Sequence, residues 1–586
     1  MKPLTNADDC EAARQLLDEC LKARGEWFCA ELSAARANMR VSLRQDEWEL
    51  SARRGGLHFA YWSAAGARVW RVVAWECAAD GQVRLDVTRR AGAERATLEL
   101  IARATVADAR AELLAARQQA CAELAARVCQ MLPGSRVEWA RLSAGARRAE
   151  PGRYARVLLR RGHELIAATG AVVGLRAHEV DAVLASALVW WLRLQGSARQ
   201  PRARSRELWL VVEPELTAAA GERLALLRER IRGEVHLCAT RHEAGSAGIV
   251  MGALDLAGKE VRAKTRRRKE AAADELLTPE REAAALPVEA AECVPVIAPT
   301  LDELLARVPP VRRPSFEAEL SETAARIAAF APDAIDVVRA RHGETLRYHG
   351  LAFARVRQVL GHEQVWFGVQ GATTATSGSS QVDGKLGRRV GAFGRRLLHD
   401  ETWPELARLL DELATHRRAS ADDRRHLLYR SAPEAWLESL LRRDITRLDP
   451  GLRLAPLHAQ FRATRDTTGG GHARPIDLLA LRQDGRLAVI ELKVAEDAAL
   501  PLQGADYWRR IERLRRHGQL HAARLFGDAA LADDAPLVYL AAPVFSFHRS
   551  FRDLAPLIAP GIETYRFDLN EDWRAGVRVV RRTRVN

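Results

Sequence analysis

The sequence has few cysteines, and they form no recognisable metal-binding or disulfide pattern. No two of the eight make a C-x-x-C pair, and none follows Cys293. A zinc ribbon needs cysteine pairs at short spacing, and a disulfide scaffold concentrates many cysteines in a short chain. Both classes are therefore excluded, and we expect scattered free thiols in a reducing cytoplasm.

Long apolar segments are also missing. The most strongly apolar run covers only residues 182–192, whereas a membrane-spanning helix needs about 20 residues. The first residues, Met1 to Asp9, contain no apolar signal segment. We therefore expect a protein that does not bind or cross a membrane and that resides in the cytoplasm.

Lysine is scarce, although the chain is strongly basic. The 90 basic residues comprise seven lysines and 83 arginines, and the formal net charge is +14. A positive net charge favours a polyanionic partner such as nucleic acid, without proving one. Because arginine is used almost everywhere, each remaining lysine marks a position that merits inspection.

The length predicts several domains. A chain of 586 residues is too long for one hydrophobic core, and one domain per roughly 150 residues gives three to four. The patterns predict a multidomain α/β and α+β protein. Its expected parts are an N-terminal α+β region at 1–250, with a division into two subdomains near residue 135 as an alternative, a basic and then Ala/Glu/Pro-rich linker at 251–300, a middle α+β domain at 301–425, and a C-terminal domain at 426–586.

Hydrophobic periodicity predicts the elements of the first two domains. Strands are expected at 69–77, 83–88, 97–101, 208–212, 235–238, 345–355 and 364–369, and helices at 106–131, 216–231, 301–308 and 316–329. No catalytic pattern occurs in residues 1–250. Binding of a second copy of the chain, as a homodimer, or of another protein partner is therefore an open role for this half.

The most informative segment is a predicted β-hairpin in the last quarter of the chain. Two largely apolar strands, 475–481 and 487–494, are joined by an Asp-Gly turn, which is a strong hairpin signal. Apolar residues on both faces are typical of strands buried on both sides. The flanking elements are predicted as a helix at 433–448, a strand at 453–463, a helix at 500–517, a strand at 537–541, a helix at 551–558 and a strand at 563–567.

Three charged side chains share one face of this hairpin if its loop has three residues. Asp477 then lies opposite Glu491, with Cβ atoms about 4.5–5.5 Å apart, and Lys493 projects from the same face. Opposed carboxylates in a partly buried site repel each other, and a divalent cation relieves that conflict. All-oxygen ligands suit Mg²⁺ or Mn²⁺. Taken alone, Glu491 and Lys493 would also fit an ordinary strand ion pair.

The spacing resembles the signature of the PD-(D/E)XK nuclease superfamily, in particular its RecB-like and NucS-like members. The residues concerned are Pro475-Ile476-Asp477 and, after thirteen intervening residues, Glu491-Leu492-Lys493. The order of predicted elements is similar to the αβββαβ restriction-endonuclease-like core, a mixed sheet flanked by helices. The resemblance is confined to the last quarter of the chain.

The resemblance implies metal-dependent hydrolysis of phosphodiester bonds. Asp477, Glu491 and the carbonyl of Leu492 would hold Mg²⁺ or Mn²⁺. Lys493 would orient the attacking water and stabilise the charge that develops on the phosphate. Lysine is a compact charge with movable donors, whereas arginine is a broad fixed fork, so this position suits the rare lysine.

The upstream acid of the family falls on Glu434, which would bind a second ion or a water. The turn Asp449-Pro450-Gly451 matches the family's helix-to-strand turn and favours Glu434 over Glu438, which is the reserve. An alternative role for Glu434 is structural. It stands three residues after Ser431 and could complete a capping box at the helix start.

The helix after the hairpin carries Gln503 and Tyr507, which match the Q-x-x-x-Y element of the resembling branches. The two residues are one turn apart, so they share a face of the helix. They would contact nucleic acid or orient the catalytic lysine. The alternative is that they only pack the helix against its neighbours. Trp508 would pack or stack on a base. The arginines that follow on this helix would bind phosphate groups, or they would only form a solvated basic face. They are Arg509, Arg510, Arg513, Arg515 and Arg516.

We therefore expect a Mg²⁺- or Mn²⁺-dependent endonuclease or exonuclease. DNA is favoured over RNA because the resembling branches act mostly on DNA, in repair, processing or defence. The alternative is a catalytically inactive nucleic-acid-binding or assembly protein on a nuclease scaffold.

Overall fold

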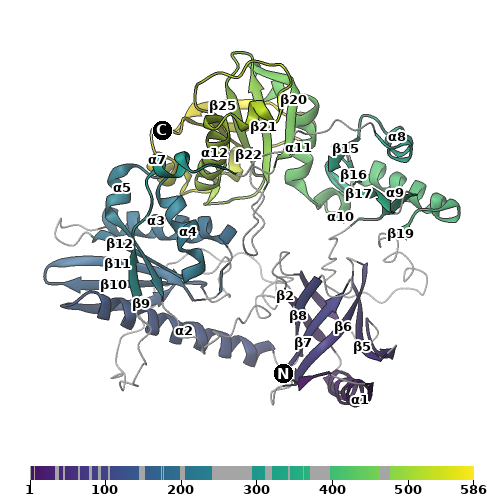
Figure 1. Cartoon of the computed structure of the whole chain (residues 1–586), viewed down its shortest axis with the longest axis horizontal. Helices are drawn as coiled ribbons and strands as arrows, with labels where there is room; N and C mark the ends of the chain where they lie inside the picture. The colour runs from purple at the N-terminus through teal and green to yellow at the C-terminus, as the bar shows by residue number, and fades with distance from the viewer. Residues whose placement is uncertain are drawn as a thin grey trace.

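The computed structural model describes most of the chain as mixed α/β structure built around several sheets (Figure 1). The described residues are 2–4, 7–24, 26–32, 39–43, 47–53, 55–63, 66–77, 82–89, 94–102, 106–143, 152–172, 174–175, 177–197, 205–240, 293–309, 320–340, 343–359, 362–369, 396–461 and 475–586. Most of the predicted linker, residues 251–292, lies outside them.

The first sheet is antiparallel and packs against one helix, α1 (Ala7–Arg24). Alternating large side chains turn one sheet face toward that helix, among them the buried Trp27, Phe59 and Trp70. In spatial order its strands are β3 (Met39–Leu43), β2 (Trp27–Leu32), β8 (Glu94–Ala102), β7 (Val83–Arg89), β6 (Gly66–Cys77), β5 (Gly56–Ser63) and β4 (Trp48–Arg53), with β1 (Lys2–Pro3) paired to β6.

The second sheet is mixed and is covered on both faces. Its strands, in spatial order, are β14 (Cys293–Val296), β13 (Val235–Thr240), β12 (Ser205–Val212), β11 (Glu164–Ala171), β10 (Tyr154–Arg161) and β9 (Ser135–Leu142). Its helices are α2 (Val106–Met131), α3 (Val180–Ser197), α4 (Thr217–Leu224) and α5 (Glu229–Glu234). The helix predicted at 216–231 is therefore two helices.

Helix α2 belongs to the second sheet and not to the first. Its buried Leu124 and Val128 pack against Val157 and Val211 of strands β10 and β12. The apolar face of α2 thus needs the second sheet for cover, so the division that we predicted near residue 135 falls before α2 instead. Helices α3 and α4 pack into a separate cluster of the same region.

The third sheet is antiparallel. Its strands are β15 (Ile335–Ala340), β16 (Gly343–Tyr348), β17 (Leu351–Val359), β18 (His362–Phe367) and β19 (Arg396–Leu397), and its helices are α8 (Glu322–Ala328), α9 (Trp403–His416) and α10 (Leu427–Arg430). The strand predicted at 345–355 is wrong, because a turn at His349 and Gly350 divides it. Both residues have positive φ, 42° and 78°. A Cβ on Gly350 would lie 1.8 Å from the carbonyl oxygen of Ala435, so only glycine fits there.

The fourth sheet carries the predicted hairpin. Its strands follow chain order: β20 (Leu452–Phe461), β21 (Ile476–Arg482), β22 (Leu487–Leu492), β23 (Leu537–Pro543), β24 (Thr564–Leu569) and β25 (Val579–Arg584). The first three are antiparallel, β22 to β24 are parallel, and β25 is antiparallel. Helix α11 (Pro433–Arg443) packs against one face of this sheet through Trp436. Helix α12 (Leu500–Arg516) packs against the opposite face through Ile511.

The elements predicted for the C-terminal domain occur in the predicted order. The upstream helix is shorter than expected, since α11 ends at Arg443 and a short 3₁₀ turn, Ile445–Arg447, follows. The helix predicted at 551–558 is α14 (Phe551–Leu554) with another such turn. Strand β25 was not predicted. The sheet is mixed and flanked by helices.

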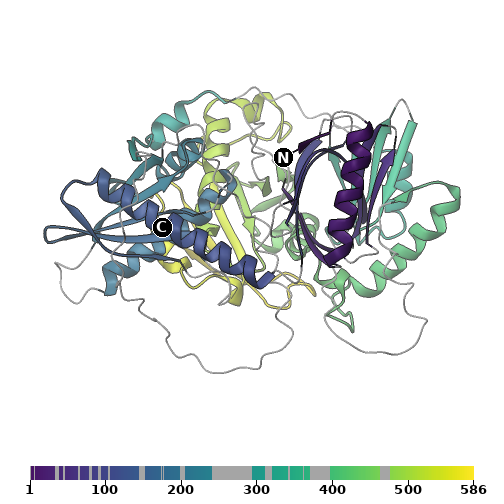
Figure 2. The same cartoon turned by 90° about the horizontal axis from the view of Figure 1, so that it is seen from below.

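The second and fourth sheets are neighbours (Figures 1 and 2). Helix α3 shares a buried cluster with Leu502 of α12 and Leu554 of α14. Helix α7 (Leu301–Ala306) also packs on α12, because Leu305 is buried with Trp508. We expected residue 301 to open the middle domain, but α7 is part of the cover of α12.

Candidate active site

Strands β21 and β22 pair in the predicted register. Leu479 lies opposite Val489, and Leu481 lies opposite Leu487. The three-residue loop between them ends at Gly485, whose φ of 83° a residue with a side chain rarely adopts. Because side chains alternate along a strand, this register gives Asp477 and Glu491 the same face.

Asp477, Glu491 and Lys493 meet at the end of the hairpin. The Oδ2 atom of Asp477 accepts a hydrogen bond from the backbone N–H of Leu492 at 2.8 Å, and Nζ of Lys493 donates to Oε1 of Glu491 at 2.6 Å. Glu491 is 2% exposed. Its second oxygen, Oε2, is buried and has no hydrogen-bond partner among the described residues. The carboxyl groups of Asp477 and Glu491 are within hydrogen-bonding reach of each other, so either a shared proton or a bound cation would relieve their repulsion.

The electrostatics of these groups follow from burial and from their closeness. Burial and the charge of Glu491 raise the pKa of Asp477 well above its usual value. Burial raises the pKa of Glu491, and Lys493 only partly offsets this. Burial opposes the charge of Lys493, but Glu491 and Asp477 together raise its pKa, so the ammonium group stays charged at neutral pH.

Helix α12 brings Tyr507 close to Glu491 and Asp477, and Gln503 to Asp497, which in turn interacts with Glu491. Gln503 is 4% exposed and donates through Nε2 to Oδ2 of Asp497 at 3.3 Å. Its Oε1 atom is buried and finds no hydrogen-bond partner in the described part of the chain. Burial, Glu491 and Asp477 raise the pKa of Tyr507, so its hydroxyl stays protonated. The sequence-predicted juxtaposition of the hairpin with this helix face is observed.

Of the two upstream acids, Glu438 interacts with Asp477, and we find no such interaction for Glu434 within the described residues. Helix α11 starts after Ala432, whose φ is 42°, and the hydroxyl of Ser431 donates to the carbonyl of Leu427 instead. Glu434 is thus the second helical residue and completes no capping box. Glu438, one turn on, is 2% exposed, and the charge of Asp477 contributes to raising its pKa. The preference for Glu434 is corrected to Glu438.

Two residues that were not predicted from the sequence form hydrogen bonds with Glu438. Arg347 of β16 donates to Oε1 at 3.2 Å, and Gln460 of β20 donates to Oε2 at 2.6 Å. Burial raises the pKa of Glu438, and Arg347 counteracts this. Arg347 comes from the third sheet, so a neighbouring domain supplies a cation to the site. No local pattern signals this contact.

The donor set suits a hard divalent cation. The buried oxygens without partners, Oε2 of Glu491 and Oε1 of Gln503, need a donor or a cation. Asp477 adds a carboxylate that is costly to ionise without a counter-charge. Leu492, whose carbonyl the sequence assigned to the same ion, is the last residue of β22. Oxygen ligands of this kind are those that Mg²⁺ and Mn²⁺ prefer.

Trp508, Arg509 and Arg510 do not lie where nucleic acid could reach them. Trp508 is 2% exposed and donates through Nε1 to the carbonyl of Pro536 at 2.8 Å. Arg509 is 3% exposed and donates to Asp506, and Arg510 forms an ion pair with Asp506 as well. The prediction that these three side chains contact nucleic acid is corrected, because the second-sheet region covers this face of α12.

The remaining arginines of α12, Arg513, Arg515 and Arg516, are less buried. Burial lowers the pKa of Arg513. Arg515 and Arg516 form ion pairs with Glu512, each at 2.7 Å, and the Arg516 side chain is 46% exposed. Arg516 is the most exposed arginine of this helix, so phosphate binding by α12 stays a prediction for its C-terminal end.

Comparison with known proteins gives no match: no family model, no curated protein and no solved structure is similar to this chain. Across the described ranges, none of the helices is both long enough and apolar enough to cross a membrane.

Proposed function

We propose that the protein is a Mg²⁺- or Mn²⁺-dependent nuclease that hydrolyses phosphodiester bonds, with DNA as the favoured substrate. The observation that carries the proposal is the convergence of Asp477, Glu491 and Lys493, in which Oε2 of the buried Glu491 has no hydrogen-bond partner within the described chain. Oε1 of Gln503 is a second buried oxygen without a partner there, and Gln503 reaches this group through Asp497. Buried side-chain oxygens are mostly hydrogen-bonded in folded proteins, so two without partners close to a charged cluster favour a bound cation there.

Some residues of the site would bind the metal ion, and Lys493 would act on the substrate. Asp477, Glu491, Gln503 and the carbonyl of Leu492 would hold the metal. The bound metal supplies a Lewis acid that neutralises phosphate charge and makes water more acidic. Lys493 is charged at neutral pH, so it stabilises negative charge on the phosphate and does not accept a proton.

Tyr507 and Glu438 would act at the edge of the site. The protonated hydroxyl of Tyr507 is a hydrogen-bond donor for a phosphate oxygen or for a carboxylate. Glu438, held by Arg347 and Gln460, would orient a water or hold a second ion. Neither role requires Glu434.

The preference for DNA, and for a task in repair, processing or defence, rests on the resemblance of the hairpin to PD-(D/E)XK nucleases. The strongly basic composition, with a net charge of +14, supports a polyanionic substrate of either kind. Endonuclease and exonuclease action are both compatible with the site.

A cleavage panel tests the proposal. Labelled single-stranded, duplex, mismatched and flapped DNA, and RNA, would be incubated with the full-length protein and Mg²⁺ or Mn²⁺, with a chelator control. We expect cleavage of DNA that the chelator and Asp477→Asn abolish. Glu496→Gln removes an exposed carboxylate from the same segment and should leave the rate unchanged.

The second candidate is a nucleic-acid-binding protein without catalysis. The complete set of Asp477, Glu491 and Lys493 weighs against it, because an inactive site has no need of all three. Calorimetric titration with Mg²⁺ separates the two: DNA binding without metal binding would favour the binding protein.

A further inference from the structure

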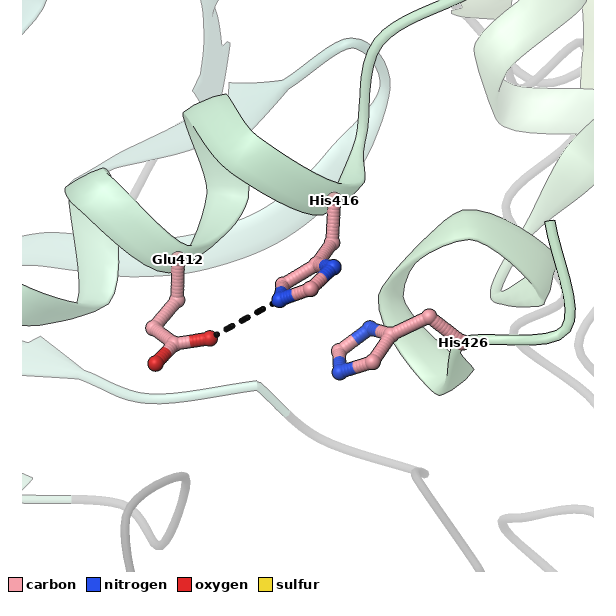
Figure 3. Close-up of side chains that lie close together, drawn as sticks. All are labelled: Glu412, His416 and His426. Carbon is pink, nitrogen blue, oxygen red and sulfur yellow. Dashed lines mark ion pairs between the residues drawn. The ribbon is translucent and has the colours of Figure 1, made fainter. Parts of the chain in front are cut away.

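A cluster of nitrogen and oxygen ligands lies in the third-sheet region, on different residues from the candidate active site. Glu412 and His416 are in the last two turns of α9, and His426 is the N-cap residue of α10. Each offers one ligand atom, and these atoms all lie within 4.8 Å of one another. Figure 3 shows the three side chains turned toward a common point.

The sequence and the fold both contribute to this arrangement. Glu412 and His416 are four residues apart, so they share one face of α9. Oε2 of Glu412 lies 3.3 Å from Nε2 of His416. The ring of His426 then stacks on that of His416, with centroids 3.7 Å apart and planes at 12°. Two elements thus bring two imidazoles and a carboxylate together.

We propose that Glu412, His416 and His426 form a binding site for one divalent transition-metal ion of the zinc class, with water at the remaining position. Two histidines and one glutamate are a donor set that binds Zn²⁺, leaving one coordination position to water. Ligand atoms at 2.0–2.1 Å from a tetrahedral zinc ion are about 3.3 Å apart, which is the separation between the Glu412 and His416 atoms.

The stacked rings of His416 and His426 also act on each other electrostatically. Two stacked imidazolium rings would repel each other, and burial together with His416 lowers the pKa of His426. Asp423 and Glu412 also face His426 and act in the opposite direction, to a smaller extent.

Metal binding requires the two imidazole rings to turn out of their stack, because a ring nitrogen binds a metal in the plane of its ring and the planes of His416 and His426 are nearly parallel. Nδ1 of His426 now accepts the backbone N–H of Leu428 over a long 3.3 Å. An imidazole that binds a metal through Nε2 carries its proton on Nδ1, so the ion would replace this weak cap. The Glu412 side chain is 51% exposed and can rotate to bring its carboxylate onto the ion.

The site would join the end of α9 to the start of α10. The next residue after His416 is Arg417, which is fully buried and donates to the carbonyls of Tyr348, Leu428 and Ser431. Ser431 lies two residues before the start of α11, which carries Glu438. A metal at the cluster would thus stiffen the junction through which the third-sheet region reaches the candidate active site.

Zinc titration of the full-length protein tests the proposal. By calorimetry in the presence of a non-thiol reductant, His416→Ala and His426→Ala should each remove one bound equivalent or weaken its binding more than about tenfold. His163→Ala changes an exposed histidine in the turn between β10 and β11 and is the matched control. Asp477→Asn should keep this zinc, since it alters only the oxygen site.

A second measurement excludes binding to the cysteines. Co²⁺ in a site of nitrogen and oxygen ligands gives visible d–d bands without the intense near-ultraviolet bands of cobalt–thiolate bonds. Zinc should also raise the melting temperature of the natural protein and not that of His416→Ala. Glu412→Gln, at an exposed position, provides the same comparison if a histidine variant fails to fold. Equal zinc binding by the natural protein and these variants, or cobalt–thiolate bands alone, would overturn the proposal.

Discussion

The Nζ atom of Lys493 lies 2.6 Å from Oε1 of Glu491, in an ion pair whose carboxylate is almost closed to solvent. Removing one partner of a buried pair leaves an uncompensated charge and costs about 3–5 kcal/mol. We therefore expect Lys493→Gln to lower the free energy of unfolding by about that amount and to abolish cleavage. Thermal unfolding and the cleavage assay measure the two effects.

A double variant separates stability from chemistry. Glu491→Gln together with Lys493→Gln removes both charges, so most of the lost stability should return, although activity should not. A double variant that is no more stable than Lys493→Gln would show that the pair contributes through something other than its buried charges.

Asp477 should destabilise the fold when no metal is bound. Burial and Glu491 raise the pKa of its carboxyl group, so the folded protein holds this proton more tightly than the unfolded chain. The resulting stability is complete below the unfolded pKa of about 3.9 and is lost as the pH rises through the folded value. At neutral pH Asp477→Asn should therefore stabilise the metal-free protein, by about 1.4 kcal/mol for each tenfold change in the acid dissociation constant that folding imposes on Asp477.

Thermal unfolding with and without Mg²⁺ checks this expectation. The ion should raise the melting temperature of the natural protein and leave that of Asp477→Asn unchanged. A melting temperature for the metal-free variant below that of the natural protein would contradict the electrostatic account of the site.

The hairpin could be predicted because its information is local. The Asp-Gly turn fixes the loop, and the alternation of side chains fixes which residues share a face, so Asp477, Glu491 and Lys493 are found together as expected. The same holds for α2, whose predicted bounds, Val106 to Met131, are those observed. Turn chemistry and periodicity lie within a few residues and need no knowledge of the rest of the fold.

The upstream acid could not be chosen in this way. The choice between Glu434 and Glu438 depends on how α11 docks on the sheet and on where the helix begins. Ala432 adopts a left-handed conformation that its residue type does not suggest, and Gly350 of another domain contacts the same helix. Tertiary packing therefore decides which acid meets Asp477.

The contacts of the arginines of α12 could not be predicted from local sequence either, because one partner is far away in the chain. Arg509 donates to Glu222, which is 287 residues earlier in the chain, at 2.9 Å. A basic run beside this hairpin suggests phosphate contacts, but packing against a distant domain buries its first two arginines, Arg509 and Arg510. Asp506, the other partner of Arg509, is local, but no local pattern reports the contact with Glu222.

Arg347 should tune the pH dependence of activity. It lowers the pKa of Glu438 against the effect of burial, so Arg347→Ala should raise that pKa further and move the acidic limb of the pH–activity profile to higher pH. Arg347→Lys should retain part of the effect. Arg396→Ala, which breaks an ion pair with Glu405 in the same region, should leave the profile in place. If the pH–activity profile of Arg347→Ala were not shifted, ionisation of Glu438 would play no part in the activity.

The contact between the second and fourth sheets depends on Arg223. This buried side chain pairs with Asp181 at 2.8 Å and with Asp506 at 2.9 Å. Burial opposes ionisation of Asp506, but Arg223 and its neighbours lower its pKa, so this stabilising effect is present at neutral pH and is lost in acid as Asp506 takes up its proton. Arg223→Met should cost about 3–5 kcal/mol.

An exposed arginine of the same region is the control for this variant. Arg230 is 85% exposed and pairs with Glu234, so Arg230→Met should change stability by no more than about 0.5 kcal/mol. Limited proteolysis should cut α12 faster in Arg223→Met, because that helix loses its cover. Equal stability and equal proteolysis of the two variants would contradict the role of the buried pair.

The most direct test of the nuclease account is metal-dependent cleavage of DNA by purified full-length protein beside its Asp477→Asn variant. The account predicts cleavage by the natural protein with Mg²⁺ or Mn²⁺, no cleavage with chelator, and no cleavage by a variant that is folded and at least as stable. Equal cleavage by both proteins, or none by the natural protein on every DNA and RNA substrate despite bound metal, would contradict it.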